Sequence, residues 1–329
     1  MDKERKKKYK IFLYKFLAVL VILGLGIGVG ITEVGWENIN EKGLIAIVES
    51  SEEYLKNMQD YLYYENYENQ QTTGSGDFEI FVFNVGQADS ILIRSEDEYM
   101  LIDAGNNADG TLIVDELKKM GVTKLEYLIA THSHEDHIGG MDDVINNIEV
   151  DNFFIPDVQY NTTSYIEIIK ACNNNKLKML EPPIGYIFKL GKASCEVMLV
   201  GSNTENLNLT SIVIEITKGN NKFLFMGDAE IENEELRAWN DIDILKVAHH
   251  GSSTSTSKDF IEQTKPEIAL ISVGENNDYG HPHKEISDLL EEKDIKTYRT
   301  DLNGTIYITS NGETYNVESL DINLNGNEK

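Results

Sequence analysis

The chain has 329 residues, which is enough for one large domain or two ordinary domains with a sizeable buried core. Hydrophobic residues make up 41% of the sequence and charged residues 26%, which excludes a collagen-like, wholly disordered or multi-span membrane protein. The 56 acidic residues outnumber the 29 basic ones, so the chain lacks the basic footprint of a nucleic-acid-binding protein. The two cysteines, Cys172 and Cys195, are too few for a cysteine-rich zinc site or a disulfide scaffold, and we expect both in the core.

The N-terminal segment predicts a membrane anchor. Residues 11–31 contain one interior lysine, and as a helix they would span about 31 Å, close to the hydrocarbon thickness of a bilayer. Residues 1–10 form a basic tail that the positive-inside rule places in the cytoplasm, with the rest of the chain outside. We therefore expect a single-pass protein of the cell membrane with an extracytoplasmic body. A cleaved signal peptide, and hence a secreted protein, is the alternative, because Gly28-Val29-Gly30 offers a small-x-small site.

The rest of the chain predicts a stalk, one domain and a tail. Residues 32–76 combine one apolar helical stripe with a polar, glycine-containing run, which is typical of a stalk and linker. Compact folding is expected from about residue 77 to 320, which leaves 321–329 as a C-terminal tail.

Short apolar runs and helical patterns alternate within residues 77–320. The expected strands are 79–83, 90–94, 100–103, 127–130, 151–155, 196–200, 212–216, 222–226, 244–247, 268–273, 297–299 and 305–309. The expected helices are 112–120, 141–148, 164–173, 230–238, 258–264 and 284–293. This order predicts an α/β domain of sheets flanked by helices.

All seven histidines fall into three short motifs, of which the first is the most informative. Residues 131–140 read THSHEDHIGG, between an expected strand and an expected helix. They bring together the imidazoles and carboxylate of a zinc-like site: His132, His134, Asp136 and His137. Alternate side chains on a strand-to-helix loop can turn toward a common point, so the motif predicts a metal centre rather than a polar surface loop.

The spacing His-x-His-x-Asp-His resembles the hallmark of the metallo-β-lactamase superfamily. The resemblance implies an αββα sandwich, here preceded by the N-terminal transmembrane helix, and one or two divalent ions, zinc or manganese. It implies that His132 and His134 hold one ion, whereas Asp136 and His137 hold a second.

Segments on both sides of this motif extend the resemblance. Residues 83–93 and 101–105 look like the opening strands of the superfamily, after which Asp103 orients a metal-binding histidine. Residues 224–230 resemble the strand end that supplies a bridging aspartate, here Asp228.

Residues 246–253 resemble the motif of the last metal ligand. We assign the metal to His249, because it directly follows an expected strand, and we interpret His250 as a residue near the site. Ser252 in the same loop is a candidate phosphate contact.

The segments VGQADS, GDAE, KVAHHGS and YGHPH together are similar to the extracellular hydrolase domain of ComEC competence proteins and the stand-alone hydrolases related to it. This resemblance covers about residues 78–310 and does not reach the ComEC channel, because this chain has only one apolar span. It implies that His281 lies near the metal centre as a general acid or a phosphate contact.

One position departs from the superfamily pattern. Many members supply a further metal-binding histidine before the bridging aspartate, but no histidine lies between His137 and His249. The corresponding strand entry holds Asn208 and Ser211, and the ComEC-like group also tends to have Asn and Ser there. The site of the first two histidines is therefore expected to be thinly ligated and weakly occupied.

Several of these residues also have ordinary structural explanations. Asp103 is a candidate turn residue, and Asp228 is a candidate N-cap of the following helix. Glu230 fits the dipole of that helix, and His281 lies close to the helix expected from residue 284.

The ligand types favour metal-assisted hydrolysis, in which an ion with an open coordination position lowers the pKa of its bound water and yields a hydroxide nucleophile. Asp136 and Asp228 are candidates to orient that water while they bind metal, and His281 completes the expected catalytic set. The sequence thus predicts an extracytoplasmic hydrolase of a small or polymeric phosphodiester.

Two other functions stay open. A competence-related DNA nuclease is supported by the resemblance, although the acidic charge balance disfavours nucleic acid as a substrate. A non-catalytic anchored binding protein with a degenerate metal site would account for the missing histidine.

Overall fold

The structure is a computed structural model that describes residues 77–202 and 205–326. The predicted basic tail, anchor and stalk over residues 1–76 lie outside the described residues and stay predictions. Within the described ranges no helix is both long enough and apolar enough to cross a membrane.

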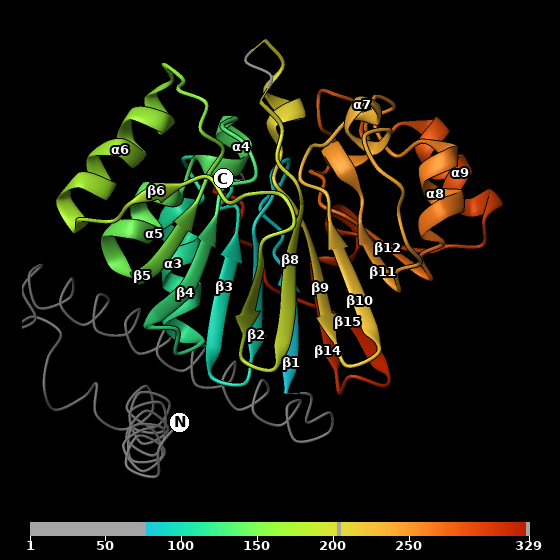
Figure 1. Ribbon diagram of the computed structural model, residues 1–329, viewed down its shortest axis with the longest axis horizontal. Coiled ribbons are helices and arrows are strands. Elements are labelled where there is room, and N and C mark those ends of the chain that lie inside the picture. The colour runs from blue at the N-terminus through green and yellow to red at the C-terminus, as the bar shows by residue number, and fades with distance from the viewer. Residues whose placement is uncertain (1–76, 203–204, 327–329) are drawn as a thin grey trace, which may run out of the picture. The chain divides into compact units, whose positions relative to one another are not determined.

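The first of two mixed sheets has eight strands in the order β15-β14-β1-β2-β3-β4-β5-β6 (Figure 1). Strands from β15 to β3 pair antiparallel, and those from β3 to β6 pair parallel. Their bounds are β1 Phe78–Val82, β2 Ile91–Ser95, β3 Glu98–Ile102, β4 Lys124–Ile129, β5 Glu149–Phe154, β6 Met179–Leu180, β14 Thr305–Ser310 and β15 Tyr315–Leu320.

The second sheet has seven strands in the order β13-β12-β11-β10-β9-β8-β7. It is antiparallel from β7 to β10 and parallel from β10 to β13. Its strands are β7 Ile187–Leu190, β8 Ala193–Leu199, β9 Val213–Lys218, β10 Asn221–Phe225, β11 Ile244–Lys246, β12 Ile268–Ile271 and β13 Lys296–Arg299.

Helices flank both sheets, with α3, α5 and α6 beside the first sheet and α8 and α9 beside the second (Figure 1). The α-helices are α3 Gly110–Lys119, α4 Glu135–Ile138, α5 Met141–Asn147, α6 Thr163–Asn175, α7 Ile231–Glu234, α8 Lys258–Thr264, α9 Lys284–Glu292 and α10 Thr300–Asn303. Two 3₁₀ turns, η2 Leu207–Thr210 and η3 Ala248–Gly251, lie near the candidate site. The expected α/β class, with sheets flanked by helices, is confirmed.

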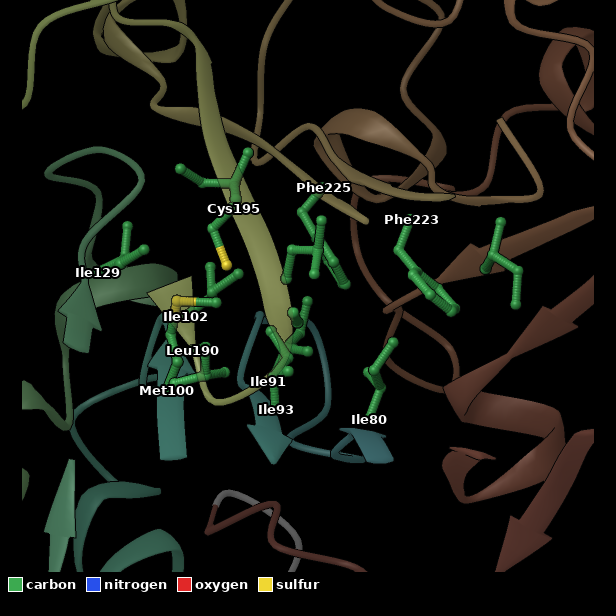
Figure 2. Close-up of a cluster of buried hydrophobic side chains, with 14 of the residues drawn as sticks. Ile80, Ile91, Ile93, Met100, Ile102, Ile129, Leu190, Cys195, Phe223 and Phe225 are labelled. Carbon is green, nitrogen blue, oxygen red and sulfur yellow. The ribbon is translucent and has the colours of Figure 1, made fainter. Parts of the chain in front are cut away.

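The main hydrophobic core lies between the two sheets and takes side chains from both (Figure 2). Because side chains alternate across a strand, Ile80 of β1 and Ile93 of β2 face the same core as Phe223 of β10. The ring centroids of Phe78 and Phe223 are 5.1 Å apart, so this contact joins one sheet to the other. Cys195 lies in this core, and both it and Cys172 are buried, as predicted. The two cysteines are not joined by a disulfide.

The sequence prediction is wrong about the end of one helix, and it misses three strands. The helix expected over 230–238 ends at Glu234, whose carbonyl oxygen accepts a hydrogen bond from the indole of Trp239. Strands β6, β7 and β15 lie at or next to sheet edges and carry too few buried residues to give an apolar run.

The chain does not become a free tail after residue 320. Ile322 and Leu324 are buried, and the Leu324 amide donates to the carbonyl of Asn84. The Gly326 amide donates to Asp109. The folded domain therefore extends at least to residue 326.

Replacing Phe223 with Ala should lower the free energy of unfolding by about 3–5 kcal/mol, because it opens a cavity between the sheets. Leu302→Ala is the matched control: this side chain is 71% exposed, and its removal should change stability by about 0.5 kcal/mol or less. Chemical denaturation of both variants tests the placement of the core, and an equal loss in both would contradict it.

Candidate metal centre

The candidate ligands follow the ends of strands in both sheets. His132 and His134 lie in the short loop between β4 and α4, where His134 is the N-cap of α4, and His137 lies within that helix. Asp228 follows β10 of the second sheet, and His250 lies in η3, just after the neighbouring β11. The strand ends of two sheets thus supply one group of side chains.

Asp103, just after β3, fixes the ring of His137. Its Oδ2 accepts a hydrogen bond from His137 Nδ1 at 2.8 Å, and both carboxylate oxygens accept bonds from Thr131. This arrangement turns His137 Nε2 toward Asp228 Oδ1, 3.3 Å away. Asp103 is fully buried, so it is not the turn residue that the sequence offered as the alternative.

Four residues form one compact group, which we call the His250 cluster: Asp136, His137, Asp228 and His250. His250 Nε2 lies 3.4 Å from Asp136 Oδ2 and 3.8 Å from Asp228 Oδ1. The Nδ1 atom of the same ring donates to the carbonyl of Ser272, which leaves Nε2 to face the cluster.

A divalent cation fits the His250 cluster. His137 Nε2, Asp228 Oδ1 and His250 Nε2 are buried and have no hydrogen-bond partner, an arrangement that is costly unless something satisfies them. Imidazole nitrogens and carboxylate oxygens are the usual ligands of zinc and manganese. These three atoms and the Asp136 carboxylate therefore form a donor set suited to such an ion.

A second group, the His132 cluster, consists of His132, His134 and Asp228. His132 Nε2 lies 2.9 Å from His134 Nδ1 and 3.7 Å from Asp228 Oδ2. Asp228 therefore presents one oxygen to each cluster, the position expected of a bridging carboxylate.

Both clusters border a cavity of about 450 Å³. Its lining consists of Gln87, Asn106, His134, Glu135, Asp136, Asp228, His249, His250, Tyr279 and His281. No lysine or arginine is among these residues.

Sequence comparison identifies the family to which this chain belongs. The signature of the "Metallo-beta-lactamase superfamily" matches residues 83–275, more than half of the chain. The chain belongs to the metallo-β-lactamase superfamily.

The relatives within this superfamily include competence proteins, as the sequence motifs predicted. ComE operon protein 3 of Bacillus subtilis (strain 168) is 28% identical over 255 residues, which cover 70% of this chain and 33% of the relative. Competence protein ComA of Neisseria gonorrhoeae is 28% identical over 237 residues, which cover 69% of this chain and 31% of the relative. The chain thus spans about a third of the length of these relatives.

Among solved structures, the metallo-β-lactamase fold protein YhfI from Bacillus subtilis aligns with a TM-score of 0.49 and 13% identity. The alignment covers 68% of this chain and 95% of that protein.

The sequence assigned the last superfamily ligand to His249, but the neighbouring His250 occupies that place in the compact group. The structure groups His250, and not His249, with Asp136, His137 and Asp228. The reason is the backbone: His249 and His250 have φ angles of 50° and 52°, so the chain turns sharply after β11 instead of continuing as a strand. Position relative to the strand was therefore a poor guide to which ring enters the cluster.

Asn208 and Ser211 lie beside the site in supporting positions. Ser211 Oγ accepts a hydrogen bond from the Asp228 backbone amide, which holds the end of β10 against the entry to β9. Asn208 Nδ2 donates to Glu230 and lies 3.4 Å from the ring nitrogens of His249. Ser252 bonds to Thr254 and does not line the cavity, so the geometry gives no support to its role as a phosphate contact.

Glu230 belongs to this neighbourhood, although the sequence suggested only a helix-dipole charge. It does begin α7 through a capping box with Asn233. Its carboxylate also accepts hydrogen bonds from Asn206, Asn208 and Thr254. Its position two residues after the bridging aspartate was the one available sequence signal.

Gln87 determines which ring nitrogen of His281 carries the proton. The Gln87 carbonyl oxygen accepts from the Gly274 backbone amide, so its NH₂ group donates to His281 Nδ1 at 3.2 Å. Burial and the nearby His250 and His249 rings lower the pKa of His281 to about 4. At neutral pH His281 is therefore an uncharged ring with its proton on Nε2, which suits contact with an anionic oxygen better than the general-acid role.

A buried ion pair that the sequence did not reveal lies behind His250. Lys246 Nζ donates to Asp89 Oδ2 at 2.9 Å, and both side chains are almost fully buried. Asp89 Oδ1 lies 3.8 Å from His250 Nδ1. Burial alone would raise the pKa of Asp89, but Lys246 and then His250 outweigh it and hold the pKa below its ordinary value.

Lys246→Met should lower the free energy of unfolding by about 3–5 kcal/mol, because it leaves the buried Asp89 charge without its partner. Adding Asp89→Asn to Lys246→Met should recover part of this loss. Chemical denaturation of the single and double variants measures the coupling between the two residues. Strictly additive losses would show that the pair does not act as a unit.

The metal-free protein should lose stability as the pH rises above about 6.5. Burial opposes protonation of His137 and His250, but carboxylates, Asp228 foremost, outweigh it and raise both pKa values. A folded-state pKa above the unfolded value contributes stability below the unfolded pKa, and this contribution disappears as the pH rises through the folded pKa.

Chemical denaturation in chelator between about pH 6.5 and 9 tests this trend. With zinc added the stabilisation should instead grow with pH, because metal and protons compete for the same ligand atoms. A free energy of unfolding that rises with pH in chelator would contradict the charge assignment.

Proposed function

We propose that this metallo-β-lactamase superfamily protein is a metal-dependent hydrolase of phosphodiesters. The observation that supports it best is the convergence of three buried, unpartnered ligand atoms, on His137, Asp228 and His250, beside the Asp136 carboxylate. A divalent ion there would supply a Lewis acid that lowers the pKa of water and stabilises negative charge on a substrate oxygen.

Two residues are suited to handle water and substrate. The Asp136 side chain is 32% exposed and lines the cavity, so its carboxylate can accept a hydrogen bond from an attacking water and orient it. Burial opposes ionisation of Asp136, but His137 and His250 outweigh it and hold its pKa below the ordinary value, so it is an anion at neutral pH. The Nε2–H of neutral His281 can donate to a phosphoryl oxygen.

The charge of the cavity favours a short diester over a long polyanion. Its lining includes Glu135, Asp136 and Asp228 but no lysine or arginine. A protein that tracks a nucleic-acid backbone needs basic side chains to neutralise successive phosphates. Cleavage of DNA is the second candidate, because the relatives include competence proteins.

From the sequence pattern we also propose that residues 11–31 anchor the protein in the cell membrane, with the hydrolase domain outside the cytoplasm. The polarity of the basic tail supports this orientation.

Full-length protein should hydrolyse bis(p-nitrophenyl) phosphate with added zinc or manganese and lose activity in chelator. Asp228→Asn removes the carboxylate shared by both clusters. Loss of a residue that merely supports a metal ligand can cost roughly 100-fold in activity, so this variant should lose at least that much. Asp115→Asn is the matched control, since this exposed aspartate lies on α3, outside the residues that line the cavity.

Parallel assays with single-stranded and double-stranded DNA distinguish the two substrate classes. Turnover of the small diester without DNA cleavage supports the proposal, whereas faster cleavage of DNA favours the nuclease. Metal binding without turnover of any ester overturns both and favours a binding protein.

A further inference from the structure

The two oxygens of Asp228 divide the surrounding imidazoles into two sets. Oδ1 lies 3.3 Å from His137 Nε2 and 3.8 Å from His250 Nε2. Oδ2 lies 3.7 Å from His132 Nε2 and 3.8 Å from His249 Nε2. His249 therefore faces the oxygen that belongs to the His132 cluster, while its neighbour faces the other oxygen.

The turn after β11 produces this division. His249 and His250 are consecutive residues with positive φ, a conformation that is uncommon outside glycine, although His adopts it more often than most residues do. Such backbone is maintained where the surrounding structure requires it, often at functional sites. Here it presents two adjacent rings, with centroids 6.4 Å apart, to the two oxygens of one carboxylate.

Hydrogen bonds hold the His249 ring through Nδ1, while Nε2 faces Asp228 Oδ2 and has the Asn208 amide nitrogen 3.4 Å away. The Thr254 hydroxyl donates to Glu230 Oε1 at 3.2 Å, so its oxygen accepts from His249 Nδ1 at 3.0 Å. Glu230 Oε1 itself lies 3.5 Å from the same nitrogen. A carboxylate behind the non-coordinating nitrogen is the usual support of a metal-binding histidine.

The His132 cluster has room for one more ligand. It contains only two histidines and the shared Asp228, and no histidine precedes Asp228 after His137 in the sequence. His249 is not part of this compact group, and its side chain is 22% exposed. Binding of an ion by His249 would therefore require its ring to shift toward His132 and His134.

We propose that His249 is the missing ligand of the His132 cluster, so that the His249-His250 pair supplies one imidazole to each of two adjacent metal sites. Glu230 and Thr254 then act as positioning residues that hold the His249 ring through Nδ1. The proposal rests on the metal centre of the proposed function and adds to it a second site with its own ligand.

Metal binding tests this directly. Metal-stripped full-length protein is titrated with zinc by calorimetry, and bound metal is counted by mass spectrometry after dialysis. The unmodified protein should bind two ions. His249→Asn keeps a residue that tolerates positive φ and should weaken one site at least tenfold while the other is unchanged. His250→Asn should weaken the other site.

Two further variants separate positioning from general damage. Glu230→Gln keeps the shape of the side chain but removes its charge, and should weaken the same site as His249→Asn by about 10–100-fold. His283→Ala removes a histidine outside both clusters and should leave both affinities unchanged.

The outcomes are distinct. Two unchanged affinities in His249→Asn overturn the proposal, even where the variant loses turnover, and leave the proposed hydrolase standing. Absence of metal binding by the unmodified protein overturns both. One ion in the unmodified protein, lost with His250→Asn but not with His249→Asn, also overturns the second site.

Discussion

Asp228 places a buried negative charge where the strand ends of the two sheets meet. Burial alone would raise the pKa of this carboxyl, but His137, His250 and His132 outweigh it and keep the group ionised. The same charge stabilises positive charge around it, whether on protonated imidazoles or on a bound cation. Because its backbone amide is fixed by Ser211, the position of this charge depends on the pairing of β9 with β10. The chemistry of the site thus depends on the register of the second sheet.

Three of the imidazoles around Asp228 are held on their far side by different parts of the fold. Asp103 at the end of β3 bonds to His137, the carbonyl of Ser272 bonds to His250, and Thr254 with Glu230 bonds to His249. Buried charges and dipoles are tolerated only where they are paired in this manner. The core between the sheets therefore does more than stabilise the domain, because it fixes the strand ends from which these supporting groups extend.

The sequence predicted the features that depend on residues close to one another in the chain. The His-x-His-x-Asp-His motif and most strands follow from neighbouring residues alone, and the resemblance of residues 224–230 to a superfamily segment pointed to Asp228. The choice between His249 and His250 depends on two positive φ angles that no apolar pattern reveals. The role of Glu230 depends on residues 206, 208 and 254, which only the folded chain brings together. Edge strands such as β7 were missed for a related reason, since half-exposed residues give no continuous apolar run.

The charge of the cavity connects metal binding to substrate binding. Glu135, Asp136 and Asp228 line a space without a lysine or arginine, so without metal only protonated imidazoles such as His250 offset their repulsion of an anionic ester. Cations in the two clusters would reverse that local field and would at the same time supply the Lewis acid. Binding of an anionic ester and binding of metal should therefore be favourable to each other, as linkage requires when two ligands interact. Under the proposed function, the acidic lining would therefore bind an anionic ester better once metal occupies the clusters.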